Sequence, residues 1–346
     1  MTDEPPAAGD LLLHLGTYDR LGGEGLYPLR LGADDLLRLG EPCGAIRNGS
    51  FGTFGRRAGI HYFVNEQQDG TVGAYRLEPA GWRKLAEAPT GGAAPCFVAL
   101  DPTETLLAVA NYGSGSIALL SLAPSTGAFS GPLMRHRNRG SGPDVDRQSG
   151  PHAHCVRFSP DGRWLFSVDL GTDQILAFEL PIGEASEPRI AYSAPRGSGP
   201  RHLLLHPDGD RAFLVSELAS TIMLLERTGG TFRCVQQEST LPPGFAGRSL
   251  GGHLALNAAG DRLYVSNRGH DSLAVFAVNA RGLTLLQHID SGGVSPRFFL
   301  VMEDRERLVL ANEEDGTVAL FAIRPDGLLM PLSNELRVPG AAFIAR

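Results

Sequence analysis

The chain has 346 residues, of which 42% are hydrophobic, and its formal net charge is -7. A charge of this sign, without a clustered basic face, excludes a protein that binds nucleic acid through its phosphates. The 44 glycines and 24 prolines lie in short clusters between strand-like runs. This composition indicates an all-β fold with many tight turns rather than a disordered chain.

The N-terminal stretch, residues 1–16, is acidic, and His14 interrupts its short apolar run. This pattern is typical of neither a signal peptide nor a membrane-spanning segment. We therefore expect a cytosolic protein that does not associate with membranes. An internal repeat favours a single domain over residues 1–346, in which residues 1–9 form a flexible tail.

Four cysteines are widely spaced and form no C-x-x-C motif. In a reducing compartment such cysteines are typically buried free thiols, and a disulfide or a zinc site is the alternative. We expect free thiols at Cys43, Cys96, Cys155 and Cys234.

A repeated pattern dominates the chain after residue 59. Each copy contains an apolar strand, a turn similar to Pro-Asp-Gly, a second apolar strand that ends in Asn, Asp or Ser, and then a third and a fourth strand. Six copies are clear, and their second strands end at Asn65, Asn111, Asp169, Ser216, Asn267 and Asn312. Successive copies lie 45 to 58 residues apart, which is typical of the four-stranded antiparallel blades of a β-propeller.

The two ends of the chain together predict a seventh blade. Residues 11–31 supply later strands of a blade but lack a first strand, and residues 340–346 offer a lone strand that would fill the vacancy. Pairing of the two ends would close the ring and remove exposed sheet edges. In the next blade, the first strand is in doubt because Gly49–Gly55 departs from the usual strand pattern.

The longest step between copies contains the extra segment Met134–Gly150. Its first half is typical of a solvated loop. Its second half lies directly before a strand that begins with two histidines, and we expect it to shape a pocket.

The predicted blade geometry brings polar side chains to one rim of the ring. The first strand of a blade lines the central channel and the second runs antiparallel to it, so the start of one and the end of the other share a rim. Counting outward from each turn makes five pairs of residues face each other: Cys96 and Tyr112, His154 and Leu170, Arg201 and Glu217, Gly252 and Arg268, and Arg297 and Glu313. His152, His202 and His253 lie close by in the sequence.

Structural roles compete with functional ones at this rim. The pairs Arg201–Glu217 and Arg297–Glu313 could be cross-strand ion pairs that fix the register of the strands. His154 could bind a loop carbonyl, His202 and His253 could point sideways, and His206, beside a turn at the other end, is assigned a structural role.

Arg268 differs from its neighbours because it faces a glycine and has no evident partner on its own blade, which favours a ligand contact. A histidine, a carboxylate and several arginines on one rim indicate an anionic ligand with a carbonyl group or an acidic proton.

Nearly the whole chain resembles the seven-bladed lactonase family, which includes bacterial propeller-type 6-phosphogluconolactonases and the related carboxymuconate-lactonizing enzymes. The most specific string is GSGPDVDRQSGPHAH at residues 140–154, with further matches at residues 16–18, 197–209 and 295–299. The resemblance implies that the catalytic residues are His154, Arg201, Glu217 and Arg268. It also places His152 and Arg147 in the walls of the site.

Our first hypothesis, which the resemblance implies, is a lactone hydrolase that opens 6-phospho-glucono-1,5-lactone. His154 or Glu217 would take a proton from water, and Arg201 or Arg268 would stabilise the oxyanion. A remaining arginine, Arg297 or Arg147, would hold the phosphate. The residues predicted to bind substrate are His152, Arg147, Arg297, His202 and His253.

Two other hypotheses use the same rim. A muconate-type lactonizing enzyme would move a proton next to a carboxylate, and a non-catalytic propeller would pair its rim charges among themselves and leave no open pocket. Under the hydrolase hypothesis we expect no metal and no cofactor. The expected partner is a small anionic lactone, and the sequence leaves the oligomeric state open.

Overall fold

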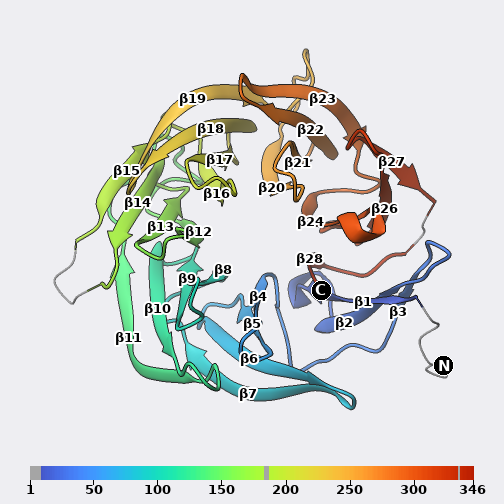
Figure 1. The fold of residues 1–346 in the computed structure, drawn as a ribbon, viewed down its shortest axis with the longest axis horizontal. Coiled ribbons are helices and arrows are strands. Elements are labelled where there is room, and N and C mark those ends of the chain that lie inside the picture. The colour runs from blue at the N-terminus through green and yellow to red at the C-terminus, as the bar shows by residue number, and fades with distance from the viewer. Residues whose placement is uncertain (1–8, 183–186, 334–335) are drawn as a thin grey trace.

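The computed structural model describes residues 9–182, 187–333 and 336–346, which form seven four-stranded antiparallel sheets. The sheets are arranged as blades around a central axis, so the predicted seven-bladed propeller is confirmed (Figure 1). The tail predicted for residues 1–9 lies, except for its last residue, outside the described residues. None of the described helices is long and apolar enough to cross a membrane.

Blade 1 contains both ends of the chain. From the axis outward its strands are β28 (Ala341–Ala345), β1 (Leu11–Thr17), β2 (Leu26–Leu31) and β3 (Leu37–Leu39). Strand β28 pairs antiparallel with β1, with Leu15 opposite Ile344. The predicted closure of the ring is confirmed, because the C-terminal segment supplies the inner strand that the N-terminal segment lacks.

Blades 2 to 7 each use four consecutive strands. Their inner strands are β4 (Gly52–Gly55), β8 (Pro95–Leu100), β12 (Ala153–Phe158), β16 (Pro200–Leu205), β20 (Leu250–Leu256) and β24 (Pro296–Met302). Their second strands are β5 (Ile60–Asn65), β9 (Leu106–Asn111), β13 (Trp164–Asp169), β17 (Arg211–Ser216), β21 (Arg262–Arg268) and β25 (Arg307–Asn312). Five of these six end at the predicted residue, and β21 extends one residue further.

The third and outer strands complete the blades. The third strands are β6 (Thr71–Glu78), β10 (Ser116–Leu122), β14 (Gln174–Glu179), β18 (Thr221–Thr228), β22 (Ser272–Asn279) and β26 (Val318–Ile323). The outer strands are β7 (Gly81–Pro89), β11 (Phe129–Arg137), β15 (Arg189–Ser193), β19 (Thr231–Ser239), β23 (Gly282–Asp290) and β27 (Leu329–Leu332). Two short 3-10 helices are described, η1 (Asp19–Leu21) and η2 (Glu303–Arg305).

Burial explains the near-continuous apolar runs of the second strands. Every residue of β13 is buried, and β9, β17 and β25 are buried after their first residue. Both faces of these strands pack against neighbouring blades, so hydrophobic and polar residues need not alternate. In the outer strand β11, by contrast, His136 is half-buried while Arg135 and Arg137 on either side are exposed.

One expectation from the sequence was wrong in part, and one question that the sequence left open is answered. The first half of Met134–Gly150 is not all loop, because Met134–Arg137 belongs to β11. An outer strand has one packed face only, so its sequence is as polar as that of a loop. The doubtful first strand of blade 2 does exist as β4, although it is only four residues long.

Two of the residues that end the predicted second strands, Asp169 and Asn267, have a structural role. The Asn267 side chain donates to the carbonyl oxygen of Thr240 (2.8 Å), and Asp169 accepts from the backbone N–H groups of His152 and Thr172 (both 3.0 Å). These bonds hold the connections between blades, which carry the residues of the rim described next.

Candidate functional site

A β-bulge at the start of the inner strand presents one side chain in each of four blades. In blade 5, Pro200 pairs with Ser216 and His202 with Val215, so Arg201 is an extra residue between them. The same shift occurs at Cys96, His154 and Arg297. Bulges re-aim a side chain, and they are common next to functional sites.

The bulges correct the predicted register. Counting outward from each turn placed the strands one residue out of register already at the turn, and the bulge adds a second residue, so every facing pair is wrong by two positions. Arg268 pairs with Leu250 rather than with Gly252, and its Nη2 donates to the carbonyl oxygen of Gly251 (3.0 Å). The expectation that Arg268 has no partner on its own blade was therefore wrong.

The opposite side of each hairpin contributes the residue that follows the second strand. Its backbone N–H donates to a carbonyl 18 residues earlier, as in Glu217 to Gly199 (2.6 Å), Tyr112 to Ala94 (2.9 Å) and Glu313 to Ser295 (2.9 Å). The equivalent positions of the other blades are Tyr18, whose N–H donates to the carbonyl oxygen of Gly340, and Arg268, which ends β21 and pairs with Leu250. Seven positions therefore surround the axis at one rim, and they are Tyr18, Glu66, Tyr112, Leu170, Glu217, Arg268 and Glu313.

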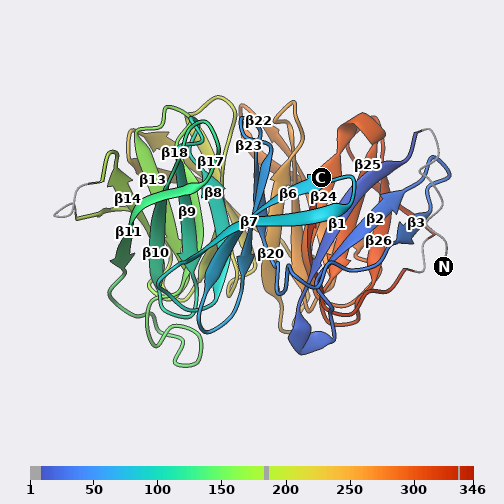
Figure 2. The same cartoon turned by 90° about the horizontal axis from the view of Figure 1, so that it is seen from below.

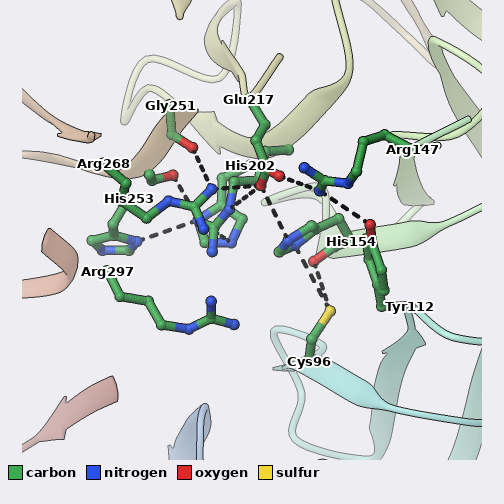
Figure 3. A network of polar contacts seen from close by, with 12 residues as sticks. Cys96, Tyr112, Arg147, His154, His202, Glu217, Gly251, His253, Arg268 and Arg297 are labelled. Atoms are coloured by element: carbon green, nitrogen blue, oxygen red, sulfur yellow. Dashed lines mark hydrogen bonds and ion pairs between the residues drawn. The ribbon is translucent and has the colours of Figure 1, made fainter. Parts of the chain in front are cut away.

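Glu217 is the centre of the first polar cluster on this rim (Figure 3). Its Oε2 accepts from Arg201 Nε (3.1 Å) and contacts Arg268 Nη2 (2.7 Å), while its Oε1 accepts from Arg147 Nη2. Burial alone would raise the pKa of Glu217, but the arginines lower it well below its usual value. We call Glu217, Arg147, Arg201, Arg268 and His154 the Glu217 cluster.

His154 is almost completely buried beside this carboxylate. Its Nε2 lies 3.8 Å from Glu217 Oε2, which is too far for a hydrogen bond, and its Nδ1 lies 3.7 Å from Cys96 Sγ. Burial, followed by the charge of Arg201, lowers the pKa of His154 well below 6.5. The imidazole is therefore neutral at pH 7, as a general base must be.

The three arginines differ in how far they are committed to the protein. Only 3% of the Arg201 side chain is exposed, and its Nη1 also donates to the carbonyl oxygen of Gly252 (2.7 Å). The exposed fraction is 11% for Arg268 and 25% for Arg147. The Nε atom of Arg268 is buried and has no hydrogen-bond partner among the described residues. Arg268 and Arg147 are therefore the arginines that can reach a ligand.

Arg147 comes from the loop between β11 and β12, which was expected to shape a pocket. Its Nη2 also donates to the Tyr112 hydroxyl (3.2 Å), and Gln148 Nε2 ties the loop to the carbonyl oxygen of Leu170 (2.8 Å). The His152 ring stacks on Tyr112 with ring centres 4.5 Å apart, and its Nδ1 lies 2.9 Å from the Tyr112 carbonyl oxygen. This loop and η1 lie on the same face of the ring (Figure 2).

Arg297 belongs to a second polar cluster on the same rim. Its Nη1 donates to Glu313 Oε2 (3.1 Å), its Nη2 lies 3.9 Å from Glu66 Oε2, and its guanidinium lies over the Tyr18 ring at 5.0 Å. Arg20 binds Glu313 from the other side. We call Tyr18, Arg20, Glu66, Arg297 and Glu313 the Arg297 cluster.

The structure places His202 and His253 behind the rim rather than on it. Their Nδ1 atoms are 3.3 Å apart, His202 packs against Phe97, and the His253 ring stacks on Phe298 at 4.2 Å. His253 also lines a cavity of about 620 Å³ at the opposite end of the inner strands, together with Arg157. His206, predicted to be structural, lies at its turn with Nε2 3.2 Å from the carbonyl oxygen of Gly260.

Two large cavities formed by described residues lie away from both clusters. One of about 890 Å³ lies between the outer part of blade 3 and blade 4. Neither this cavity nor the one beside His253 is lined by His154 or Glu217. Among the described residues, no group of three or more His, Cys, Asp and Glu side chains is placed to hold a metal ion.

A protein-family model described as "Lactonase, 7-bladed beta-propeller" matches residues 12–345. The chain belongs to the lactonase family. It is 31% identical over 336 residues to a 6-phosphogluconolactonase of Bacillus subtilis, an alignment that covers 94% of this chain and 95% of that protein. The resemblance inferred from the sequence is therefore confirmed.

Solved structures agree with the family assignment. A protein from Lactobacillus plantarum superposes with a TM-score of 0.88 at 29% identity, covering 97% of this chain and 99% of that one. A periplasmic gluconolactonase of Pseudomonas aeruginosa superposes with a TM-score of 0.87 at 30% identity, covering 97% of this chain and 98% of that one. The fold of this lactonase-family member thus matches its relatives over nearly the full chain.

Reasoning from the sequence missed two residues of this lactonase-family rim, Tyr18 and Glu66. A signal for Glu66 was present, because it directly follows Asn65 just as Glu217 follows Ser216. Counting outward from each turn identifies a rim residue only where a first strand supplies a residue opposite it. No first strand was recognised in blade 2, so Glu66 had no partner from which to be inferred.

The buried histidines predict how stability depends on pH. Burial, the largest cause, lowers the pKa of His154, His202 and His253 well below 6.5. Below pH 6.5 these histidines are protonated in the unfolded chain but stay neutral in the folded protein. The free energy of unfolding therefore falls as pH decreases. Between its pKa in the folded protein and its pKa in the unfolded chain, each histidine changes the free energy of unfolding by about 1.4 kcal/mol per pH unit.

Urea unfolding at intervals between pH 8 and pH 5 measures this effect. We expect a constant free energy of unfolding at pH 7 and above, and a steep decrease from pH 6.5 to pH 5. In His253→Phe, which removes one of the three groups, the decrease should be shallower. A free energy that stays constant down to pH 5 would contradict burial of neutral histidines.

Proposed function

We propose that the protein hydrolyses the lactone of a sugar acid, and that its substrate is 6-phospho-glucono-1,5-lactone, which it opens to 6-phosphogluconate. The observation that carries the proposal is a neutral imidazole beside a carboxylate that three guanidinium groups hold ionised, on the rim of a lactonase-family propeller. The B. subtilis and P. aeruginosa relatives support a lactone substrate through their names.

His154 is the better candidate for the general base than Glu217. Both carboxylate oxygens of Glu217 already bind arginines, and these arginines lower its pKa well below the usual range. The Nε2 atom of His154 makes no hydrogen bond to Glu217 and is free to accept a proton from water. The Glu217 carboxylate then stabilises the imidazolium that forms.

The reaction needs one proton to be moved twice. As His154 takes a proton from water, the hydroxide adds to the lactone carbonyl and gives a tetrahedral oxyanion. The ring C–O bond then breaks, and His154 returns the proton to the ring oxygen, which becomes a hydroxyl group. Arg268 is the better donor to the oxyanion because its side chain is 11% exposed, whereas the Arg201 side chain is 3% exposed and committed to Glu217, Gly252 and His202.

The ion pairs also favour one arginine for the phosphate. Arg297 already lies between the carboxylates of Glu313 and Glu66, which neutralise its charge. Arg147 is more exposed, lies on a loop at the mouth of the site, and shares its single carboxylate partner with two other arginines. We therefore assign the phosphate to Arg147 rather than to Arg297.

Extensive pairing of the rim charges is what a non-catalytic scaffold would also show. The argument against a scaffold is that, among the described residues, the pairing leaves His154 Nε2 and Arg268 Nε without a hydrogen-bond partner. A buried donor without a partner costs free energy unless a ligand or water satisfies it.

The cytosolic location expected from the sequence is part of the proposal, and fractionation of cells tests it. The P. aeruginosa relative is described as periplasmic.

Removing Arg147 tests the assignment of the phosphate. We expect Arg147→Ala to raise KM for the 6-phosphorylated lactone about 10- to 100-fold, because a charge-assisted hydrogen bond is lost. Its effect on the unphosphorylated lactone should be within about threefold. The matched control is Arg163→Ala, whose side chain is 68% exposed at the opposite end of blade 4. Equal effects of Arg147→Ala on the two lactones would contradict the assignment.

The function itself is tested by parallel assays of purified protein with 6-phospho-glucono-1,5-lactone, glucono-1,5-lactone and carboxymuconate. We expect saturable acceleration of lactone opening above the spontaneous rate, greatest with the phosphorylated lactone. Turnover of carboxymuconate alone would identify a lactonizing enzyme instead. Acceleration of none of the three reactions would favour a scaffold.

A further inference from the structure

The Arg297 cluster has no role in the mechanism above, yet it faces the same axis. Its members come from blades 7, 1 and 2, while His154 and Glu217 come from blades 4 and 5 on the other side of the ring (Figure 1). In Figure 3 the Arg297 guanidinium points toward His154 and Cys96, and no contact joins it to them. A ligand on the axis that touches the Glu217 cluster therefore also meets the Arg297 cluster.

The two clusters differ in charge. The Glu217 cluster holds three guanidinium groups and one carboxylate, so it is strongly positive. In the Arg297 cluster, the guanidinium groups of Arg297 and Arg20 are balanced by the carboxylates of Glu66 and Glu313. An anionic group of a ligand is therefore attracted to the first cluster, and the second cluster favours neutral polar groups.

Several contacts hold the Arg297 cluster together, and some of its polar atoms make no hydrogen bond to a described residue. Arg20 and Arg297 both lie over the Tyr18 ring, at 4.6 and 5.0 Å, and the Tyr18 hydroxyl donates to Glu66 Oε2 (2.7 Å). Ser50 donates to the same oxygen. No described residue donates to Glu66 Oε1, and Arg297 Nη2, which lies 3.9 Å from Glu66 Oε2, makes no hydrogen bond to a described residue. These atoms are partly exposed, since the side chains of Glu66 and Arg297 are 17% and 14% exposed.

A carboxylate acceptor beside a guanidinium donor matches the hydroxyl groups of a polyol. The carboxylate accepts the O–H of one hydroxyl, while the guanidinium donates to the oxygen of the same or the next hydroxyl. We propose that Glu66 and Arg297 form a subsite for the hydroxyl groups of the sugar lactone, and that Glu66 determines specificity for polyhydroxylated lactones over plain ones. This inference rests on the proposed hydrolysis.

The experiment compares glucono-1,5-lactone with δ-valerolactone, which has the same ring without hydroxyl groups. We expect Glu66→Gln to lower kcat/KM for glucono-1,5-lactone about 10- to 100-fold and to change the value for δ-valerolactone less than twofold, because a site built to bind hydroxyl groups discriminates through them. Tyr18→Phe, which removes one hydroxyl that holds Glu66, should show the same selectivity to a smaller extent. The matched control is Glu179→Gln, an exposed glutamate at the end of β14.

A loss of equal size with both lactones, or no loss with either, would overturn the subsite. Titration calorimetry with gluconate and with 5-hydroxyvalerate separates this failure from failure of the hydrolysis. We expect wild-type protein to bind gluconate more tightly than 5-hydroxyvalerate and Glu66→Gln to lose that preference. If the wild-type protein opens neither of these lactones nor 6-phospho-glucono-1,5-lactone, the hydrolysis is wrong, and an unchanged preference in Glu66→Gln would then reject the subsite as well.

Discussion

The variant His154→Ala is expected to lose about 10²- to 10⁴-fold in kcat/KM for 6-phospho-glucono-1,5-lactone, which is the usual contribution of a general base. His154 is the only group of the Glu217 cluster that is uncharged at pH 7, because burial lowers its pKa, and no arginine occupies its Nε2. The measurement is the initial rate of lactone opening, corrected for spontaneous hydrolysis. Circular dichroism shows whether the variant is folded.

The control for this variant is His136→Ala, a half-buried histidine on the outer strand β11 that contacts Phe178. We expect His136→Ala to keep kcat/KM within about twofold of the wild-type value, since surface substitutions away from a site have small effects. If folded His154→Ala keeps near-wild-type kcat/KM, then His154 has no part in the mechanism.

Replacing Glu217 is expected to have the largest effect on stability. Glu217→Gln leaves Arg147, Arg201 and Arg268 close together without a neutralising carboxylate, and the Arg201 side chain is only 3% exposed. Removing one partner from a buried ion cluster costs about 3 to 5 kcal/mol. Activity should fall as well, because no carboxylate then stabilises the imidazolium of His154 and the arginines are no longer held in place.

Urea unfolding at pH 7.5 measures this free energy against Glu226→Gln. Glu226 is an exposed partner of Arg233 on β18, and loss of a surface ion pair costs at most about 1 kcal/mol. A free energy of unfolding for Glu217→Gln within 1 kcal/mol of the wild-type value would show that Glu217 does not hold the arginines together.

The propeller could be predicted because its hairpins are buried on both faces. Apolar runs separated by Pro-Asp-Gly turns repeat with the period of a blade, and the residues that end the second strands, such as Asp169 and Asn267, tie the connecting loops. Ring closure followed from the missing first strand at the N-terminus. Outer strands were harder to predict, since the polar sequence of β11 is also typical of a loop.

The site could be predicted only in part. Counting outward from each turn brought Glu217 and Arg268 to the rim, but the register was wrong by two positions at Arg201. One position comes from the turn and one from the bulge, which adds a residue without changing the apolar pattern on either side of it. The contact between Arg147 and Glu217 joins residues 70 positions apart through an irregular loop. No local pattern encodes such a contact. The position of the loop before two histidines predicted that it shapes a pocket, and the family resemblance singled out Arg147 within it.

A crystal structure of the protein with 6-phosphogluconate, the product of the proposed reaction, tests the central claim most directly. We predict that the product carboxylate lies within hydrogen-bond distance of His154 Nε2 and Arg268, with its phosphate against Arg147 and its hydroxyl groups against Glu66. Binding of the product in the cavity at the opposite end, beside Arg157 and His253, with the rim unchanged, would contradict the claim that this rim is the active site.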